Sequence, residues 1–278
     1  MKVFGTSHVG KRREQNEDSL LIKPDLNLYA VADGVGGQPK GEVASYIATY
    51  LLEDLFKKHM PEAEALQEQV FNSGDTSLIS RGLKLLNVHL CQTLSVINQS
   101  ILQAAEDLPG AKGMASTLSA LWLFDRFTFV MHTGDSRIYR LRNQHLVRLT
   151  QDQSQQNRLI GALGLDETVK VQVHEDIRQC GDRYLICSDG VTTHIQDHEL
   201  LLLMGNPAPA KIISKIVNLA LNRGGVDNIT AIVVFDNDCS NSNVQATPVV
   251  YGGPFYRESL SGRDRKWYPP PVKDKGPF

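Results

Sequence analysis

Four aspartates stand at the ends of apolar runs, each beside small residues: Asp33, Asp135, Asp189 and Asp227. Four of the eight positions that follow Asp33 are glycine. A single Asp-Gly pair is most simply a turn, but several acids gathered at one edge of a sandwich would raise one another's pKa unless a cation held them. Because ligands that offer only oxygen suit Mg²⁺ or Mn²⁺, the pattern predicts a divalent-metal site. The glycines would let backbone carbonyls and waters approach the ion.

Phosphate-binding loops, dinucleotide-binding loops and zinc sites also use glycines or histidines, but their motifs fit this sequence less well. A P-loop needs Gly-Lys followed by Ser or Thr, which residues 36–42 do not supply, and a dinucleotide fingerprint needs glycine where Pro39 stands. His194 and His198 have the spacing of a zinc pair on a helix, but the segment between them lacks the glutamate of zinc proteases. We therefore retain the oxygen-ligated site.

The elements that must position these acids alternate in blocks along the chain. Apolar residues at helical spacing predict helices over 42–58, 83–105, 194–204 and 208–222. Apolar runs bounded by turn residues predict strands over 19–23, 28–33, 116–124, 126–135, 137–142, 145–150, 169–175, 183–189 and 229–236. Because most strands follow one another across hairpin-length breaks, the sheets should be largely antiparallel. We expect an α+β fold of two stacked sheets flanked by pairs of helices.

The composition indicates one globular domain followed by a tail. Apolar residues make up 41% of the chain and charged residues 22%, as in ordinary globular proteins. Residues 1–236 carry the sustained apolar periods, whereas 237–278 is rich in Pro, Gly, Ser and Asn and is expected to stay flexible. The net charge of −2 gives no sign of nucleic-acid or membrane-surface binding.

The cysteines and the apolar runs indicate in which cellular compartment the protein resides. The four cysteines form no C-x-x-C pair, and the first ten residues lack the apolar core of a signal peptide. No apolar run approaches the roughly 18 residues of a membrane span. We therefore expect free thiols at Cys91, Cys180, Cys187 and Cys239, and a cytoplasmic protein.

Seven short motifs follow one another in an order that is typical of one known family. They are RREQNED (12–18), VADGVGG (31–37), GMASTL (113–118), TGDSRIYRL (133–141), LTQDQS (149–154), LICSDGV (185–191) and GGVDNIT (224–230). In this order they resemble the metal-dependent Ser/Thr protein phosphatases of the type 2C (PPM) family, in its bacterial form. The resemblance covers residues 1 to about 236 and implies an αββα sandwich with two Mn²⁺ or Mg²⁺ ions at one edge.

The resemblance also implies which residues would hold the two ions. Asp33 would bridge both ions, and the carbonyl of Gly34 would ligate one of them. Asp189 and Asp227 would hold the other. A water that bridges the ions would then attack phosphorus.

Further residues match the family around this centre. Glu17 and Asp18 stand where the family uses acids near the metals, partly through water. Arg13 matches the phosphate-binding arginine, whose planar fork suits phosphate oxygens. Asp135 matches the acid that can hold a third ion in bacterial members.

Two departures from the family pattern concern the surroundings of the site. Position 35 is Val, where many eukaryotic members carry a histidine proposed as general acid. Gln153 replaces the histidine of an Asp-His-Ser motif, and only residues 155–161 separate Ser154 from the Ala-Leu-Gly at 162–164. The flap segment that relatives carry here is thus largely deleted. We expect a permissive cleft and a weakly held third ion near Asp135.

The function expected from these residues is hydrolysis of phosphoserine and phosphothreonine in proteins, opposing a Ser/Thr kinase. We expect a monomer whose aromatic tail docks a partner. Two alternatives stay open: a partner-switching regulator phosphatase with one protein substrate, and a catalytically weak scaffold protein. The intact set of Arg13, Asp33, Asp189 and Asp227 argues against the scaffold, because a degenerate member should lose ligands.

Overall fold

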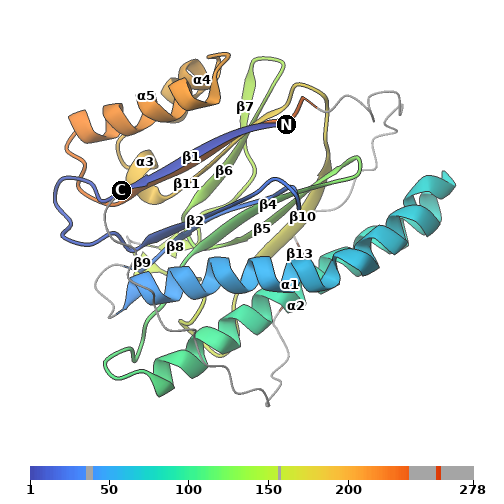
Figure 1. The fold of residues 1–278 in the computed structure, drawn as a ribbon, viewed down its shortest axis with the longest axis horizontal. Coiled ribbons are helices and arrows are strands. Elements are labelled where there is room, and N and C mark those ends of the chain that lie inside the picture. Colours follow the sequence, from blue (N-terminus) through green and yellow to red (C-terminus); the bar gives the residue numbers. More distant parts are fainter. Residues whose placement is uncertain (36–39, 156–157, 238–254, 258–278) are drawn as a thin grey trace.

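Two antiparallel β-sheets lie face to face and carry helices on both outer faces (Figure 1). The computed structural model describes residues 1–35, 40–155, 158–237 and 255–257. All strand pairs within these ranges are antiparallel. The predicted α+β sandwich of two antiparallel sheets is confirmed.

The two sheets differ in strand number and order. The first sheet has the order β1 (Lys2–His8), β12 (Ile229–Phe235), β11 (Arg183–Cys187), β6 (Arg137–Arg142) and β7 (His145–Arg148). The second has the order β13 (Phe255–Arg257), β10 (Val171–Ile177), β5 (Phe127–Thr133), β4 (Leu118–Phe124), β3 (Leu28–Asp33) and β2 (Asp18–Lys23). A separate hairpin joins β8 (Ser154–Gln155) to β9 (Arg158–Leu159).

The helices cover the two outer faces. The long α1 (Gly41–Gln69) and α2 (Thr76–Asp107), joined by the short η1 (Phe71–Ser73), share an apolar core with the second sheet. The helices α4 (Asp197–Met204) and α5 (Pro209–Asn222) share another with the first sheet. The single-turn α3 (Asp189–Thr192) follows β11 directly.

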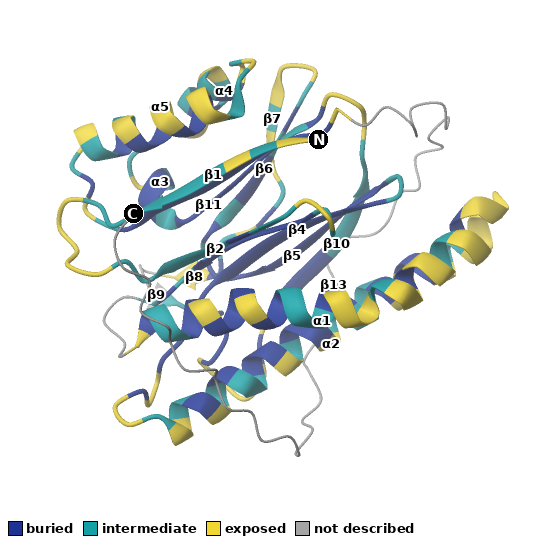
Figure 2. Cartoon of the chain, in the orientation of Figure 1, coloured by how far each residue is buried: buried dark blue, intermediate teal, exposed yellow. Residues whose placement is uncertain are grey.

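A third apolar cluster fills the space between the sheets, with side chains from both. Central strands are therefore buried on both faces, as the dark blue strands of Figure 2 show. All seven residues of β4, of β5 and of β12 are buried. This double burial explains why their sequences read as continuous apolar runs instead of alternating ones.

The helix boundaries differ from the predicted ones. The first helix continues past residue 58 and through Pro61 to Gln69, where most residues face solvent and apolar periodicity gives little signal. The second begins earlier, at Thr76, because the Asp75 side chain accepts hydrogen bonds from the amides of Ser77 (2.8 Å) and Leu78 (3.2 Å). The predicted helix over 194–204 is wrong in its first three residues, since α4 begins at Asp197.

Four strands were not predicted: β1, β13 and the two-residue strands β8 and β9. β1 is an edge strand of mixed exposure, so no apolar run marks it, yet it pairs with β12 over seven residues. The three residues of β13 lie in the segment assigned to the tail, where they pair with Val171–Val173 of β10. Most of that segment, 238–254 and 258–278, lies outside the described residues, as does Cys239.

The expectation of a free thiol is wrong for Cys180. Cys180 is disulfide-bonded, whereas Cys91 and the buried Cys187 are thiols. Cysteine usage therefore gives no argument for a reducing compartment. Within the described ranges, none of the helices combines the length and the apolarity that a membrane span requires.

Candidate active site

The topology brings the predicted acids to one edge of the sandwich. Asp18 begins β2 and Asp33 ends β3, and the register of these strands places the two residues opposite each other. In the other sheet, Asp189 follows the end of β11 and Asp227 precedes β12. The Ser188 hydroxyl donates to Oδ2 of Asp18 at 2.9 Å, which ties the two sheets together at this edge.

The carboxylates interact strongly with one another. Burial raises the pKa of Asp33 well above its usual range, and the charges of Asp18 and Asp189, among others, raise it further. Burial also raises the pKa of Asp18 to about 6, despite hydrogen bonds from Thr230 and Ser188. A hydrogen bond to Asp33 opposes part of the rise in the pKa of Asp18 and in the pKa of Asp189. Two carboxylates can share such a bond only with a proton between them, so the cluster needs either protons or a cation.

Asp135 belongs to the same electrostatic group. Burial raises its pKa to about 6, and the charge of Asp189 adds to the effect. Its turn is held by Gln153, whose side-chain oxygen accepts from the Thr133 hydroxyl (3.1 Å) and the Gly134 amide (3.2 Å). The residue that departs from the family pattern therefore anchors the turn that carries Asp135.

Glycine follows two of the acids because neighbouring backbone leaves no room for a side chain. A Cβ at Gly34 would lie 2.8 Å from the carbonyl oxygen of Glu17 and would overlap the backbone of Gly41. A Cβ at Gly190 would overlap the carbonyl oxygen of Asn228. The glycines thus allow the segments that carry different acids to approach one another, which the composition alone did not indicate.

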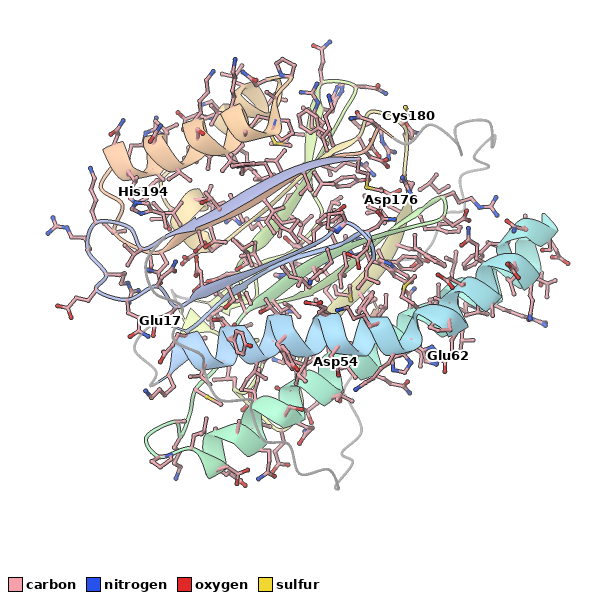
Figure 3. All side chains as sticks on the ribbon, in the orientation of Figure 1. Glu17, Asp54, Glu62, Asp176, Cys180 and His194 are labelled. Atoms are coloured by element: carbon pink, nitrogen blue, oxygen red, sulfur yellow. The ribbon has the colours of Figure 1, made fainter. Side chains whose placement is uncertain are left out.

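Arg13 lies on the same edge, against Asp227. Its Nη2 donates to Oδ2 of Asp227 at 2.8 Å, and this hydrogen bond raises the pKa of the Arg13 guanidinium. The Arg13 side chain is 37% exposed, so solvent reaches it. Glu17 lies beside the first turn of α1 (Figure 3), and burial raises its pKa. The predicted phosphate ligand and the predicted metal ligands are therefore neighbours.

The donor set fits a hard divalent cation. Among the described residues, no three His, Cys, Asp or Glu side chains already form a metal-binding set. Oδ1 of Asp18 is nevertheless buried and accepts no hydrogen bond within these residues. A bound cation would reduce the repulsion between carboxylates that raise one another's pKa. A site that offers only oxygen ligands suits Mg²⁺ or Mn²⁺.

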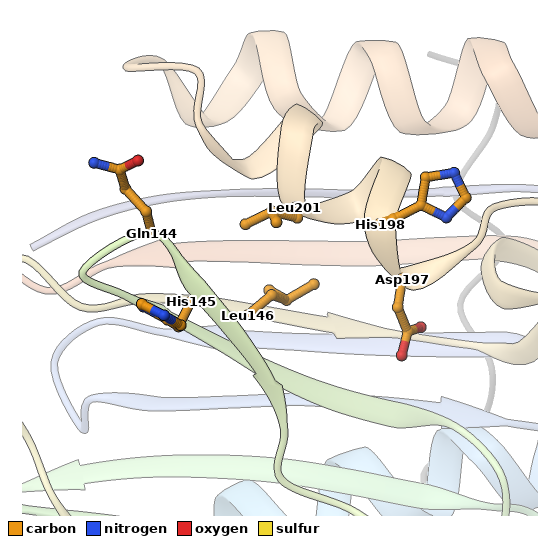
Figure 4. Close-up of a pocket in the computed structure, with 6 residues that line it drawn as sticks. All are labelled: Gln144, His145, Leu146, Asp197, His198 and Leu201. Atoms are coloured by element: carbon orange, nitrogen blue, oxygen red, sulfur yellow. The ribbon is translucent and has the colours of Figure 1, made fainter.

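The two histidines with the spacing of a zinc pair have other contacts. His194 accepts a hydrogen bond from the amide of Val226 at 3.3 Å. His198 lines a groove of about 290 Å³ between the β6–β7 turn and α4 (Figure 4). The groove is lined by Gln144, His145, Leu146, Asp197, His198 and Leu201. It contains none of the predicted site residues.

Sequence reasoning missed several residues that hold the site together. Thr117 donates its backbone amide to the carbonyl of Asp33 (2.8 Å), and its hydroxyl accepts from the Asp33 amide (3.0 Å). Asn228, beside Asp227, binds three backbone groups of the loop that carries Arg13. Both residues belong to the quoted motifs, but only their tertiary contacts reveal what they do.

Comparison with known proteins supports the family resemblance. The protein phosphatase 2C family model matches residues 4–220. The Ser/Thr protein phosphatase PstP of Mycobacterium tuberculosis is 29% identical over 274 residues, which cover 91% of this chain and 48% of PstP. The chain thus spans about half the length of PstP. The Ser/Thr phosphatase stp of Listeria monocytogenes is 28% identical, with 81% of this chain and 92% of stp covered.

Solved structures agree with this result. The PstP catalytic domain in complex with two manganese ions superposes with a TM-score of 0.69 at 28% identity, covering 84% of this chain and 96% of that one. PppA, described as a key regulatory component of T6SS in Pseudomonas aeruginosa, has a TM-score of 0.64 at 28% identity. The match covers 84% of this chain and 96% of PppA. From the match over residues 4–220, the seven ordered motifs and the shared sandwich, the chain belongs to the protein phosphatase 2C family.

Proposed function

We propose that this protein hydrolyses phosphoserine and phosphothreonine in proteins with the help of two Mn²⁺ or Mg²⁺ ions. The observation that carries the proposal is the convergence of Asp18, Asp33 and Asp189 at one edge of the sandwich, beside the Arg13–Asp227 pair. Named relatives are Ser/Thr phosphatases, and one contains two manganese ions. Phosphate release from a phosphothreonine peptide with Mn²⁺, and its loss in EDTA, tests the function.

The family resemblance and the acids that meet at this edge support an assignment of the residues that would hold the ions. Asp33, the Gly34 carbonyl, Asp189 and Asp227 would supply the oxygen ligands, and Asp18 and Glu17 would act partly through water. When bound, two such ions lower the pKa of a water and stabilise the attacking and leaving oxygens at phosphorus. Thr117 holds the Asp33 backbone, and Ser188 orients the Asp18 carboxylate. A third ion near Asp135 would be weakly held.

Arg13 would bind the phosphate. Both oxygens of Asp227 are engaged, Oδ1 by the Asn228 amide (2.8 Å) and Oδ2 by Arg13. The bond to Oδ2 uses one of the five N–H donors of the Arg13 guanidinium, so other donors remain for phosphate oxygens. The Arg13 side chain is partly exposed, so its planar guanidinium can offer paired donors to a phosphate.

Replacing Arg13 should mainly weaken substrate binding. Charge-assisted hydrogen bonds contribute about 1.5–3 kcal/mol, so Arg13→Ala should raise KM for a phosphothreonine peptide by about 10- to 100-fold, with a smaller loss in kcat. Steady-state kinetics at saturating Mn²⁺ measure both constants. Arg12→Ala is the matched control, because it removes the same charge from the adjacent, exposed position. Equal effects of the two changes would show that Arg13 contributes only as a surface charge and does not bind the phosphate specifically.

The proposal extends to the surroundings of the site. The catalytic domain would end at residue 236, because Asp236 is fully buried and paired with Arg178 at 2.8 Å. Residues 237–278 would form a tail that docks a partner, apart from Phe255–Arg257, which pair with β10. Because the segment between Gln153 and Gly161 is short, the cleft would discriminate little between peptides, and tail docking would supply specificity. A Ser/Thr kinase would supply the phosphorylated substrates.

The scaffold alternative is disfavoured by the same geometry. A protein without catalysis would gain from replacing buried carboxylates that repel one another, yet Asp18, Asp33 and Asp189 are all retained and adjoin. A regulator phosphatase with one protein substrate would use the same chemistry and differ only in its partner.

A further inference from the structure

Arg13 sits on a loop that is attached to the domain at few points. Residues 11–15 are all exposed. Glu17, at the end of the loop, accepts from the Gly34 amide (3.1 Å) and the Ser45 hydroxyl (2.6 Å) through its carbonyl. Before Glu17, the Lys11 amide donates to the Gly225 carbonyl at 2.7 Å, and Asn16 donates to the Ser7 hydroxyl at 2.7 Å. A phosphate ligand on such a loop can be directed into the site only if something fixes the loop on both sides of Arg13.

Asn228 provides that fixation. Its side-chain amide donates to the carbonyls of Val9 (2.9 Å) and Gln15 (3.0 Å), and its oxygen accepts from the Glu17 amide (2.8 Å). Arg13 lies between the two segments that are held in this way. Asn228 is only 3% exposed, so these bonds are shielded from water. A carboxamide can do this because it carries two donors and an acceptor, which neither aspartate nor serine offers.

The same short segment also holds the Arg13 side chain. Asp227, the residue before Asn228, accepts from Arg13 at 2.8 Å. The loop approaches this segment closely, because a Cβ at Gly10 would overlap the carbonyl oxygen of Asp227. Gly10 also has φ +83°, which disfavours other residues. Residues 227 and 228 therefore fix the backbone of the loop and the position of Arg13 together.

We propose that Asn228 is a positioning residue that acts through Arg13, setting where the guanidinium stands relative to the acids at the edge of the sandwich. Asn228 itself touches neither substrate nor the reacting atoms. The inference rests on the proposed function, because Arg13 is assigned there to phosphate. It predicts that the effect of losing Asn228 on substrate binding depends on the presence of Arg13.

A double-mutant cycle tests this dependence. Asn228→Ala should raise KM for a phosphothreonine peptide by about tenfold in the wild-type background, and by less than about twofold in the Arg13→Ala background. The Mn²⁺ affinity, measured by calorimetry, should change by less than about threefold. A residue with a merely structural role would give the same factor in both backgrounds, and that result would overturn the proposal.

Asn98 offers a matched control. It is a fully buried asparagine with the same number of hydrogen bonds to a loop, accepting from the Gly164 amide (2.7 Å) and donating to the carbonyls of Asp166 (3.0 Å) and Glu167 (3.3 Å). Asn98→Ala should lower the melting temperature as Asn228→Ala does, yet leave KM within about twofold of wild type. An equal rise of KM in both variants would contradict a specific role for Asn228.

Hydrogen exchange separates this inference from the proposed function. Amide exchange over residues 9–17 should accelerate in Asn228→Ala and stay unchanged in Asn98→Ala, whether or not the protein releases phosphate. Unchanged exchange in Asn228→Ala would refute the inference alone, whereas absence of turnover in wild type would refute the function. If Asn228→Ala does not fold, Gly10→Ala displaces the same loop and should raise KM. A folded Gly10→Ala with unchanged KM would overturn the proposal.

Discussion

Asp33→Asn should reduce kcat by about 10³-fold or more, the largest loss expected from a single conservative change. Asp33 is the carboxylate that contacts both Asp18 and Asp189, so removing its charge disturbs the ligand set at its centre. Metal ions contribute several kcal/mol to such reactions, and each 1.36 kcal/mol corresponds to about tenfold in rate. Asparagine keeps the size of the side chain, which limits the change to charge.

Single-turnover and steady-state phosphate release at saturating Mn²⁺ measure this effect. The control is Asp54→Asn on α1, where the aspartate is exposed and pairs with Lys58 at 2.6 Å (Figure 3). The control should retain wild-type kcat. If Asp33→Asn retained more than about a tenth of wild-type kcat, Asp33 would not be the central ligand.

The second large effect concerns the stability of the metal-free protein. The pKa values of Asp18, Asp33, Asp135 and Asp189 are raised by burial and by one another. A group whose pKa is raised in the folded state favours folding while it is protonated, and this contribution is lost as the pH rises through the folded pKa. For Asp18 and Asp135, this contribution to stability is lost as the pH rises from the ordinary pKa of aspartate to about 6.

Metal-free Asp33→Asn should therefore melt at a higher temperature than metal-free wild type at pH 7.5. Each pKa unit corresponds to about 1.4 kcal/mol, or roughly 3–5 °C in a domain of this size. The difference should shrink at pH 5, where the acids are partly protonated. With saturating Mn²⁺, wild type should melt at the higher temperature, because the cation stabilises wild type and binds the variant poorly.

Scanning calorimetry at pH 5 and 7.5, with and without Mn²⁺, measures this reversal. The comparison must be between variants, because burial lowers the pKa of His132 to about 4, and that residue opposes folding as the pH falls. The histidine contribution cancels between wild type and Asp33→Asn. Equal melting temperatures for metal-free wild type and Asp33→Asn at pH 7.5 would show that the acids do not repel one another.

Local sequence pattern predicts much of this architecture. The apolar runs of β4, β5 and β12 identify strands because both of their faces are buried, and the apolar stripe of α5 identifies a helix that covers one sheet. Aspartates at strand ends predict a metal site, because carboxylates that meet at one edge raise one another's pKa unless a cation holds them. Where burial is one-sided or slight, as in β1 and the end of α1, the pattern carries little information.

The pairings within the site could not be read from pattern. Arg13 and Asp227 are 214 positions apart, and nothing in either neighbourhood specifies the other. The three hydrogen bonds of Asn228 and the support of Asp135 by Gln153 likewise depend on how distant loops meet. The disulfide at Cys180 was missed because spacing alone does not determine which cysteines meet.

Phosphate release from a phosphothreonine peptide, measured with and without chelation of divalent ions, tests the central claim most directly. Wild-type protein should release phosphate with Mn²⁺ or Mg²⁺, lose this activity in EDTA, and regain it when Mn²⁺ is added in excess of the chelator. Undiminished release after exhaustive chelation would contradict a metal-dependent site at this edge of the sandwich. Absence of release at every Mn²⁺ and Mg²⁺ concentration would contradict the phosphatase itself.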